Sequence, residues 1–219
     1  MHTEATRIYG AAGAAEAVRA WEIFGEAFQW FPYGVAIYVL PLQHGPANPL
    51  RLRPTGLAPG MILFPYDAYK SWKGAYPAAT VQELMAKLAK RWGQGVAVLE
   101  KINARSKEAV LELAIARTCH THFESTANQV EFYLLRDEAP GATAAREKEI
   151  RSRLLAIAAR ENELARLQYL VTRDQSLIGY EASNHYYYTP VDLLEKLLNC
   201  EQVIGELRSG APIGVKGEA

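Results

Sequence analysis

The chain has 219 residues, which is enough for one large domain or two small ones with a substantial buried core. Lys and Arg together number 24, as do Asp and Glu, so the formal net charge is zero. This balance argues against a nucleic-acid-binding protein, which normally carries a basic excess that contacts phosphates. It also gives little electrostatic protection against self-association, so a homodimer is compatible with the composition.

The sequence shows no sign of export or of a membrane span. Met1-His2-Thr3-Glu4 is not the charged start of a signal peptide, and no apolar run approaches the ~20 residues of a transmembrane helix. The two cysteines, Cys119 and Cys200, are too few for a disulfide framework and lie in helical patterns. We therefore expect two reduced thiols, no membrane partner and a cytoplasmic location for the chain as given. The compartment of a longer parent protein is left open.

The first predicted helix covers residues 14–30. Its apolar residues recur at spacings of three and four and so share one face; they are Ala17, Trp21, Phe24 and Phe28. Phe31-Pro32 ends this helix, because the residue before a proline disfavours helical geometry.

Residues 32–77 form a segment of different character, which contains eight of the chain's eleven prolines. Two short apolar runs, residues 35–40 and 61–64, are each consistent with a short strand. A connection of this length is usually functional or disordered, and its aromatic content argues against disorder. We expect an ordered, functional segment packed on the helices.

The rest of the sequence is helical almost to its end. Four helices are predicted, at residues 78–103, 106–137, 143–172 and 190–207. Thr80, Ser106 and Thr189 are candidate N-caps, Pro140-Gly141 breaks the chain, and Thr143 begins the helix after it. Because short links join long helices, we expect a mainly all-α fold, an antiparallel helical bundle formed as a single helical domain over residues 1–219.

The helix at 106–137 carries a polar stripe in its second half. Residues at spacings of three and four align there: His122, Ser125, Gln129, Phe132 and Arg136. Two interpretations stay open, a solvated face and the lining of a cleft, in which His122 and Gln129 would contact a ligand. His120 and His122 point in different directions on a helix, and His120 with Glu124 supplies only two ligands, so we expect no metal site. No cofactor is expected either, because the sequence lacks a P-loop, a G-x-G-x-x-G turn, a G-x-S-x-G elbow and a C-x-x-C pattern.

Residues 174–188 form a second cluster, with four tyrosines, two acidic residues, Asn184 and His185 in fifteen positions. A tyrosine offers an aromatic face for the C–H side of a sugar ring and a hydroxyl for hydrogen bonding. We therefore nominate Asn184, His185 and Tyr186 as ligand contacts. The alternative is a packed interhelical corner that buries the tyrosine rings.

The third cluster lies in the proline-rich segment and again combines aromatic, amide and carboxylate groups. Its candidate ligand contacts are His44, Asn48, Tyr66 and Trp72. Glycoside hydrolysis normally needs two carboxylates at a set separation, and Asp67 and Glu181 are the pair we nominate. For Arg136 and Asp174 we expect a structural role, as an ion pair that joins two helices.

These segments together resemble part of a known group of proteins. The matching motifs are Ala27-Phe28, Phe31-Pro32-Tyr33, His44-Gly45-Pro46-Ala47-Asn48, Phe64-Pro65-Tyr66-Asp67, His122-Phe123-Glu124-Ser125, Asn128-Gln129, Phe132, Arg136-Asp137 and the run Asp174-x-Ser176-x-Ile178-Gly179-Tyr180-Glu181-Ala182-Ser183-Asn184-His185-Tyr186-Tyr187-Tyr188. They resemble the C-terminal helical region of large, uncharacterised bacterial proteins described as candidate glycoside hydrolases.

The resemblance implies an upstream catalytic domain, typically a barrel, that is missing here, so this chain would be a fragment of a longer protein. We expect a helical domain of a carbohydrate-active enzyme that contributes residues to a sugar-binding site and is not catalytic alone. The expected ligand is a carbohydrate or another small polar molecule. The alternative is a non-enzymatic helical scaffold or dimerisation module.

Overall fold

The computed structural model describes most of the chain. The described residues are 1–34, 37, 45–57, 67–77, 79–104, 106–178, 180–181, 185–186 and 188–215, without the side chains of 180–181 and 185–186. Both short apolar runs predicted as strands, at 35–40 and 61–64, lie outside these ranges except for Ile37, whose side chain is buried.

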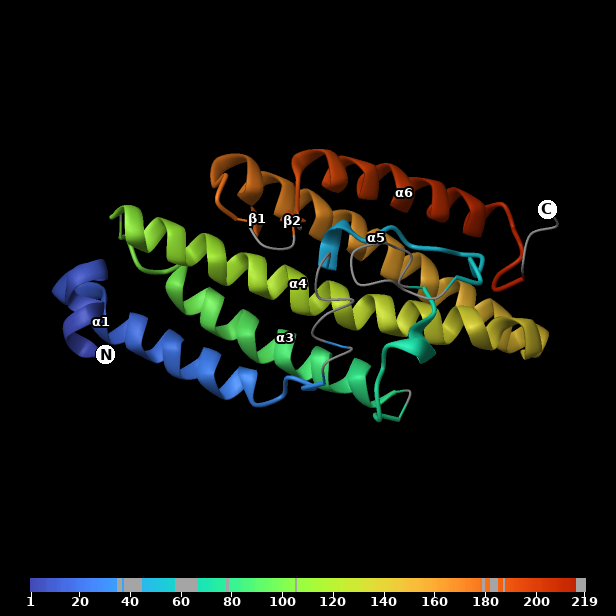
Figure 1. The fold of residues 1–219 in the computed structure, drawn as a ribbon, viewed down its shortest axis with the longest axis horizontal. Helices are drawn as coiled ribbons and strands as arrows, with labels where there is room; N and C mark the ends of the chain where they lie inside the picture. Colours follow the sequence, from blue (N-terminus) through green and yellow to red (C-terminus); the bar gives the residue numbers. More distant parts are fainter. Residues whose placement is uncertain are drawn as a thin grey trace.

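The fold is all-α, as predicted, and contains five long helices in the described ranges. They are α1 (His2–Phe28), α3 (Thr80–Leu99), α4 (Lys107–Glu138), α5 (Ala144–Asp174) and α6 (Pro190–Arg208). In Figure 1, α4 runs through the middle, with α3 and α1 on one side and α5 and α6 on the other. Each helix packs mainly on its neighbour in this order, so α4 is the element that both halves of the molecule share.

Capping residues explain most helix starts. Ser106 Oγ accepts a hydrogen bond from the Ala109 amide, and Thr143 caps α5 in the same way. Thr189 forms a capping box with Asp192 ahead of the N1 proline of α6. At α3 the predicted cap was wrong by one residue, because Thr80 is the first helical residue and Ala79 precedes it.

The first helix begins twelve residues earlier than predicted. Gly10, at φ +75°, introduces a kink, and on its N-terminal side Ala5 and Tyr9 are buried. The predicted helix begins after Gly10 and Gly13, whereas packing of small residues on the neighbouring helices extends the observed helix past these glycines.

The described parts of the proline-rich segment lie against α4 and α6 (Figure 1). Its described parts include the 3₁₀ helices η2 (Gly45–Ala47) and η3 (Tyr69–Ser71). Asn199 on α6 fixes it through two hydrogen bonds with the Leu50 backbone, at 2.7 and 2.9 Å. For its described parts, this docking confirms the predicted packing on the helices.

Two more short elements complete the description. The 3₁₀ helix η4 (Ala139–Gly141) follows α4, and a hairpin of two-residue strands, β1 (Tyr180–Glu181) and β2 (His185–Tyr186), interrupts the link between α5 and α6. The sequence predicted only a break there.

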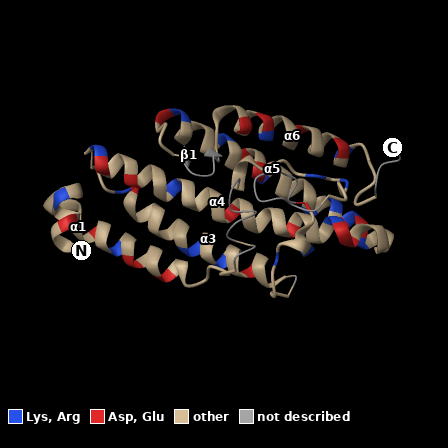
Figure 2. Ribbon diagram, viewed as in Figure 1, with Lys and Arg blue, Asp and Glu red and all other residues tan. Residues whose placement is uncertain are grey.

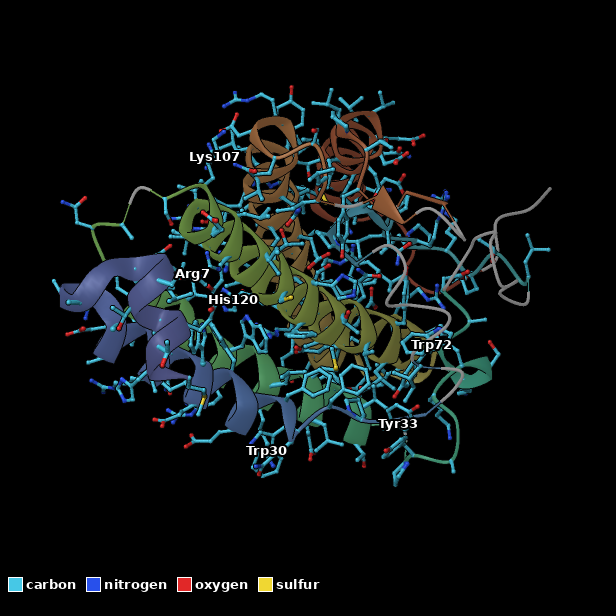
Figure 3. The ribbon with its side chains drawn as sticks, turned by 60° about the vertical axis from the view of Figure 1, so that its left-hand side comes forward. Arg7, Trp30, Tyr33, Trp72, Lys107 and His120 are labelled. Atoms are coloured by element: carbon cyan, nitrogen blue, oxygen red, sulfur yellow. The ribbon has the colours of Figure 1, made fainter. Side chains whose placement is uncertain are left out.

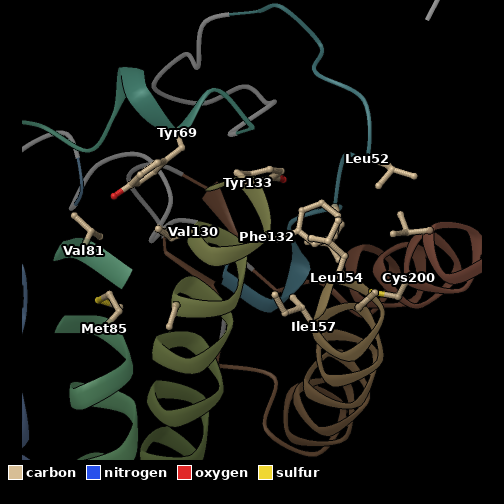
Figure 4. Packing of buried hydrophobic residues seen from close by; sticks show 14 of the residues in the cluster. Leu52, Tyr69, Val81, Met85, Val130, Phe132, Tyr133, Leu154, Ile157 and Cys200 are labelled. Carbon is tan, nitrogen blue, oxygen red and sulfur yellow. The ribbon is translucent and has the colours of Figure 1, made fainter. Parts of the chain in front are cut away.

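The main hydrophobic core fills the space around α4. Figure 4 shows Val81 and Met85 of α3 on one side of it, and Leu154 and Ile157 of α5 on the other. Cys200 is buried in this cluster, and both cysteines are free thiols, as predicted.

Charged residues of both signs are interspersed along the helices (Figure 2). Within the described ranges, no helix is both long and apolar enough to cross a membrane.

Candidate functional site

The polar stripe of α4 is buried. His122, Ser125, Gln129 and Arg136 are each at most 7% exposed, and Phe132 is fully buried between them. The solvated-face interpretation is therefore wrong. Buried polar groups are stable only with hydrogen-bond partners, so the stripe requires partners from the segments that cover it.

At its N-terminal end the stripe meets two segments that are distant in sequence. The imidazole Nδ1 of His122 shares a hydrogen bond with the hydroxyl of Tyr188, which directly precedes the N-cap of α6. Gly45 of η2 lies against the same ring: a Cβ at this position would stand 2.5 Å from Nδ1, and its φ is +34°. Tyr188 from the cluster at 174–188 and Gly45 from the proline-rich segment therefore both contact His122.

A buried ion pair lies against the middle of the stripe. Lys196 of α6 and Glu161 of α5 are both fully buried, and Lys196 Nζ donates to Glu161 Oε2 at 2.9 Å. The carboxylate also accepts from Ser125 Oγ at 2.7 Å and from Asn128 Nδ2 at 3.0 Å. This network joins α4, α5 and α6 in the core.

Two more predicted contacts lie beside this network. Gln129 Nε2 donates to the Gly45 carbonyl at 2.6 Å and to Ser125 Oγ at 2.9 Å. The backbone carbonyl of Asn48 accepts a hydrogen bond from Lys196 Nζ. The side-chain amide of Asn48 is buried, and neither its nitrogen nor its oxygen has a hydrogen-bond partner among the described residues.

The C-terminal end of the stripe carries a second buried ion pair. Arg136 Nη1 donates to Asp67 Oδ2 at 2.9 Å, and each side chain is 2% exposed. Asp67 also accepts from the Thr55 hydroxyl at 2.7 Å and the Thr55 amide at 2.9 Å. The expected pair between Arg136 and Asp174 was wrong, because Asp174 at the exposed end of α5 pairs with its neighbour Arg173.

The two ends of the stripe are separate places. Arg136 comes fourteen positions after His122, which corresponds to about 21 Å along a helix. Asp67 is therefore far from the meeting point at His122, and both of its oxygens are engaged. Trp72 belongs to the same distant end, where it is 1% exposed and packs edge-on against Tyr69 with ring centroids 4.8 Å apart.

An open pocket of about 320 Å³ lies at the His122 end. Aromatic rings dominate its described lining, which consists of Phe28, Phe31, Tyr33, Thr118, Cys119, His122, Phe123 and Tyr188. Phe28 and Phe31 stack at 5.2 Å, and Tyr33 is 77% exposed at the rim. Figure 3 shows Tyr33 and Trp30 at the outer edge of the molecule. We call this the aromatic pocket.

Thiolate chemistry is not available in the aromatic pocket at neutral pH. Burial raises the pKa of Cys119 to about 11, so the thiol stays protonated. The pocket therefore offers ring faces and the His122–Tyr188 pair, and its described lining includes no carboxylate.

Two further pockets, of about 440 and 230 Å³, lie along the N-terminal half of α4 between α3 and α5. The larger contains His120, whose Nε2 is 4.0 Å from Glu124 on the same helix face. Within the described ranges no group of three His, Cys, Asp or Glu side chains could hold a metal. Neither pocket contains a residue that the sequence nominated for ligand binding.

The stability of the fold should depend on pH through His120. Burial lowers its pKa, and the repulsion from Arg160 adds to this against the attraction of Glu124. The unfolded chain therefore binds more protons between the lowered pKa and about 6.5, so stability falls as the pH drops through this range. We expect His120→Gln to flatten the dependence of the melting temperature on pH between 5 and 8. An unchanged slope would contradict this assignment.

Several nominated residues cannot be placed. His44, Tyr66 and Asn184 lie outside the described residues, and the side chains of Glu181, His185 and Tyr186 are not described. The distance between the carboxylates of Asp67 and Glu181 is therefore untested, and this catalytic pair stays a prediction.

Sequence reasoning missed the buried charges and most of the aromatic pocket. Glu161 and Lys196 each occupy a position on the apolar stripe of their helix, and that placement was the signal that could have found them. Phe28, Phe31 and Tyr33 were noted in the resemblance but were not nominated as contacts. Comparison with known proteins adds no assignment, because no family model, curated protein or solved structure matches this chain.

Proposed function

We propose that this chain is a ligand-binding helical domain of a carbohydrate-active enzyme, and that the aromatic pocket holds one face of a sugar ring. The observation that carries the proposal is this pocket itself, where aromatic rings from the end of α1 and the residues after it, from α4 and from the residue before the N-cap of α6 line one space with His122. Aromatic side chains suit a sugar because its C–H face packs on a ring while its hydroxyls point to polar groups.

The size and the setting of the pocket support a small ligand. Its volume of about 320 Å³ lies within the usual range for small-molecule sites, near the lower end. The buried network of Glu161 and Lys196 fixes the three helices behind it, which keeps the wall formed by α4 rigid.

The proposal is for binding and not for hydrolysis by this chain alone. Asp67, the member of the nominated pair whose side chain is described, holds an ion pair with Arg136, which lies about 21 Å along α4 from His122. We propose a structural role for Asp67, so that any catalytic carboxylates would come from another part of the enzyme.

A thermal-shift screen tests this proposal with glucose, galactose, N-acetylglucosamine, maltose and cellobiose. A sugar at one hundred times its dissociation constant stabilises the fold by about 2.7 kcal/mol, which visibly raises the melting temperature. Tyr33→Ala should remove this shift without lowering the melting temperature of the free protein, because the Tyr33 side chain is largely exposed.

Trp30→Ala is the matched control. Trp30 is also an exposed aromatic residue near the end of α1, but it lies beneath the Lys87 ammonium and does not line the aromatic pocket. The sugar-induced rise in the melting temperature of Trp30→Ala should equal that of the wild type. A sugar-induced shift that survives in Tyr33→Ala would count against the pocket.

A dimerisation module is the second candidate, and one observation favours it. Val191, Leu194 and Leu198 form an exposed apolar stripe on α6, and they are 71%, 45% and 73% exposed. Their spacing of three and four residues is that of a helix-packing surface. If no sugar gives a shift and light scattering finds a dimer, this candidate replaces the first.

A further inference from the structure

The polar side chains in the buried part of the aromatic pocket already have partners within the protein. Thr118 Oγ1 accepts a hydrogen bond from Gln168 Nε2 at 3.1 Å. His122 Nδ1 shares one with the Tyr188 hydroxyl. Thr118, His122 and Tyr188 are each at most 9% exposed. A ligand hydroxyl placed here would give up its hydrogen bonds to water and compete with these internal bonds, which yields little net affinity.

Phenylalanine side chains supply the rest of the wall behind the rim, apart from Cys119. Phe28, Phe31 and Phe123 carry no polar side-chain atom. Phe28 stacks on Phe31 with ring centroids 5.2 Å apart, and it is 53% exposed. Covering an exposed aromatic ring in a concave site removes apolar surface from water. This part of the pocket therefore favours an apolar group.

The rim of the pocket has a different character. The side chain of Tyr33 is 77% exposed, and its ring centroid lies 6.4 Å from that of Phe31. The Tyr76 hydroxyl donates to the Tyr33 carbonyl at 3.1 Å, which holds the backbone at the rim. A sugar ring on Tyr33 can cover the phenol ring with its C–H face and keep its outward hydroxyls in water. The pocket thus combines an apolar interior with a rim that suits a sugar.

We propose that the ligand is an aryl glycoside, whose sugar ring lies on Tyr33 and whose aromatic aglycone enters the pocket and packs on the three phenylalanines. An aromatic aglycone suits these side chains better than an aliphatic one. Ring pairs gain from stacked and edge-on contacts, at centroid distances of about 4.5–7 Å, beyond the area that they bury. This inference rests on the proposed function and names the class of sugar derivative that the pocket selects.

The test measures binding by isothermal titration calorimetry with the methyl and phenyl β-glycosides of glucose, galactose and N-acetylglucosamine. For one of these sugars, the wild type should bind the phenyl glycoside about ten- to a hundredfold more tightly than the methyl glycoside. Burial of a phenyl group contributes about as much as burial of a phenylalanine side chain. The cyclohexyl glycoside of the same sugar should bind about threefold more weakly than the phenyl glycoside, because it is apolar but cannot stack.

Phe28→Ala separates the interior of the pocket from its rim. It removes an exposed ring, so the fold should survive, and the preference for phenyl over methyl should shrink by at least about threefold. Tyr33→Ala should weaken binding of both glycosides and keep the preference. Trp30→Ala is the matched control: Trp30 is 43% exposed and lies outside the described lining, so both affinities should equal those of the wild type.

Cys119→Leu approaches the same space from α4. The larger side chain fills part of the pocket, so it should weaken binding of the phenyl glycoside by about tenfold and leave the methyl glycoside unchanged. The melting temperature without ligand shows whether each variant is folded.

The outcomes separate the inference from the proposed function. If the wild type binds the phenyl and methyl glycosides equally tightly, the proposed function stands and the aglycone site is overturned. If the phenyl preference persists in both Phe28→Ala and Cys119→Leu, the aglycone lies elsewhere and the inference is also overturned. Phenol alone should bind far more weakly than the phenyl glycoside. If phenol binds equally tightly, or if no glycoside binds, the proposed function fails and the inference fails with it.

Discussion

Replacing Lys196 with methionine is expected to lower the free energy of unfolding by about 3–5 kcal/mol. The change leaves the fully buried Glu161 carboxylate without its cationic partner, and its remaining donors among the described residues are Ser125 and Asn128. Chemical denaturation of both proteins under identical conditions measures the difference. Lys148→Met on the exposed face of α5 is the matched control and should change stability by less than about 0.5 kcal/mol.

The double variant Glu161→Leu/Lys196→Met separates the charge from the packing. Removing both charges should recover most of the stability lost in Lys196→Met, because the uncompensated carboxylate is gone. A loss below about 1 kcal/mol in Lys196→Met would contradict a buried ion pair at this position.

The second large effect is expected for Arg136→Met, again about 3–5 kcal/mol of destabilisation. This change removes the partner of Asp67, which is 1% exposed, and a hydrogen bond from Arg136 to the Asp67 backbone carbonyl at 2.9 Å. The same denaturation experiment measures the loss. Asp67 also binds Thr55, so the proline-rich segment should loosen together with the ion pair.

Arg153→Met supplies the comparison for Arg136→Met. Arg153 pairs with Glu131 at 2.6 Å, but its side chain is 52% exposed, so the expected loss is only about 0–1 kcal/mol. Equal losses in the two variants would contradict the distinction between a buried and an exposed ion pair.

The sugar affinity of Asp67→Asn should stay unchanged, because Asp67 lies at the far end of the stripe.

Helix positions could be predicted largely from local signals. Ser106, Thr143 and Thr189 mark helix starts because their side chains satisfy free backbone amides, a rule that acts within four residues of the chain. The start of α1 could not be predicted in this way. Its first turns are held by packing on distant helices, which overrides the glycines at positions 10 and 13.

The site was predictable in its parts but not in its arrangement. Periodicity aligned His122, Gln129 and Arg136 on one face of α4, and the structure buries that face. Which segments cover each part of the stripe is a tertiary choice. The prediction therefore grouped Asn48 with Asp67, although Asn48 contacts Lys196 beside the middle of the stripe and Asp67 pairs with Arg136 at its C-terminal end. Hydrogen-bond partners 84 residues apart, such as Gln129 and Gly45, leave no local trace in the sequence.

The helical periodicity of the sequence could have revealed the buried charges, because Glu161 and Lys196 fall on the apolar stripes of α5 and α6. On α5 the buried positions recur as Ile150, Leu154, Ile157, Glu161, Leu164 and Gln168. A glutamate on an apolar stripe needs a partner of opposite charge, and Lys196 on the apolar stripe of α6 is the natural choice. The two residues could therefore have been paired before the structure was known.

The most direct test of the proposed sugar site is isothermal titration calorimetry with the sugar that gives the largest thermal shift. The protein is titrated as wild type, as Tyr33→Ala and as Trp30→Ala. We predict one sugar per chain for the wild type, the same affinity for Trp30→Ala, and binding at least tenfold weaker for Tyr33→Ala. Equal affinities in all three proteins would place the sugar elsewhere and contradict the assignment of the aromatic pocket.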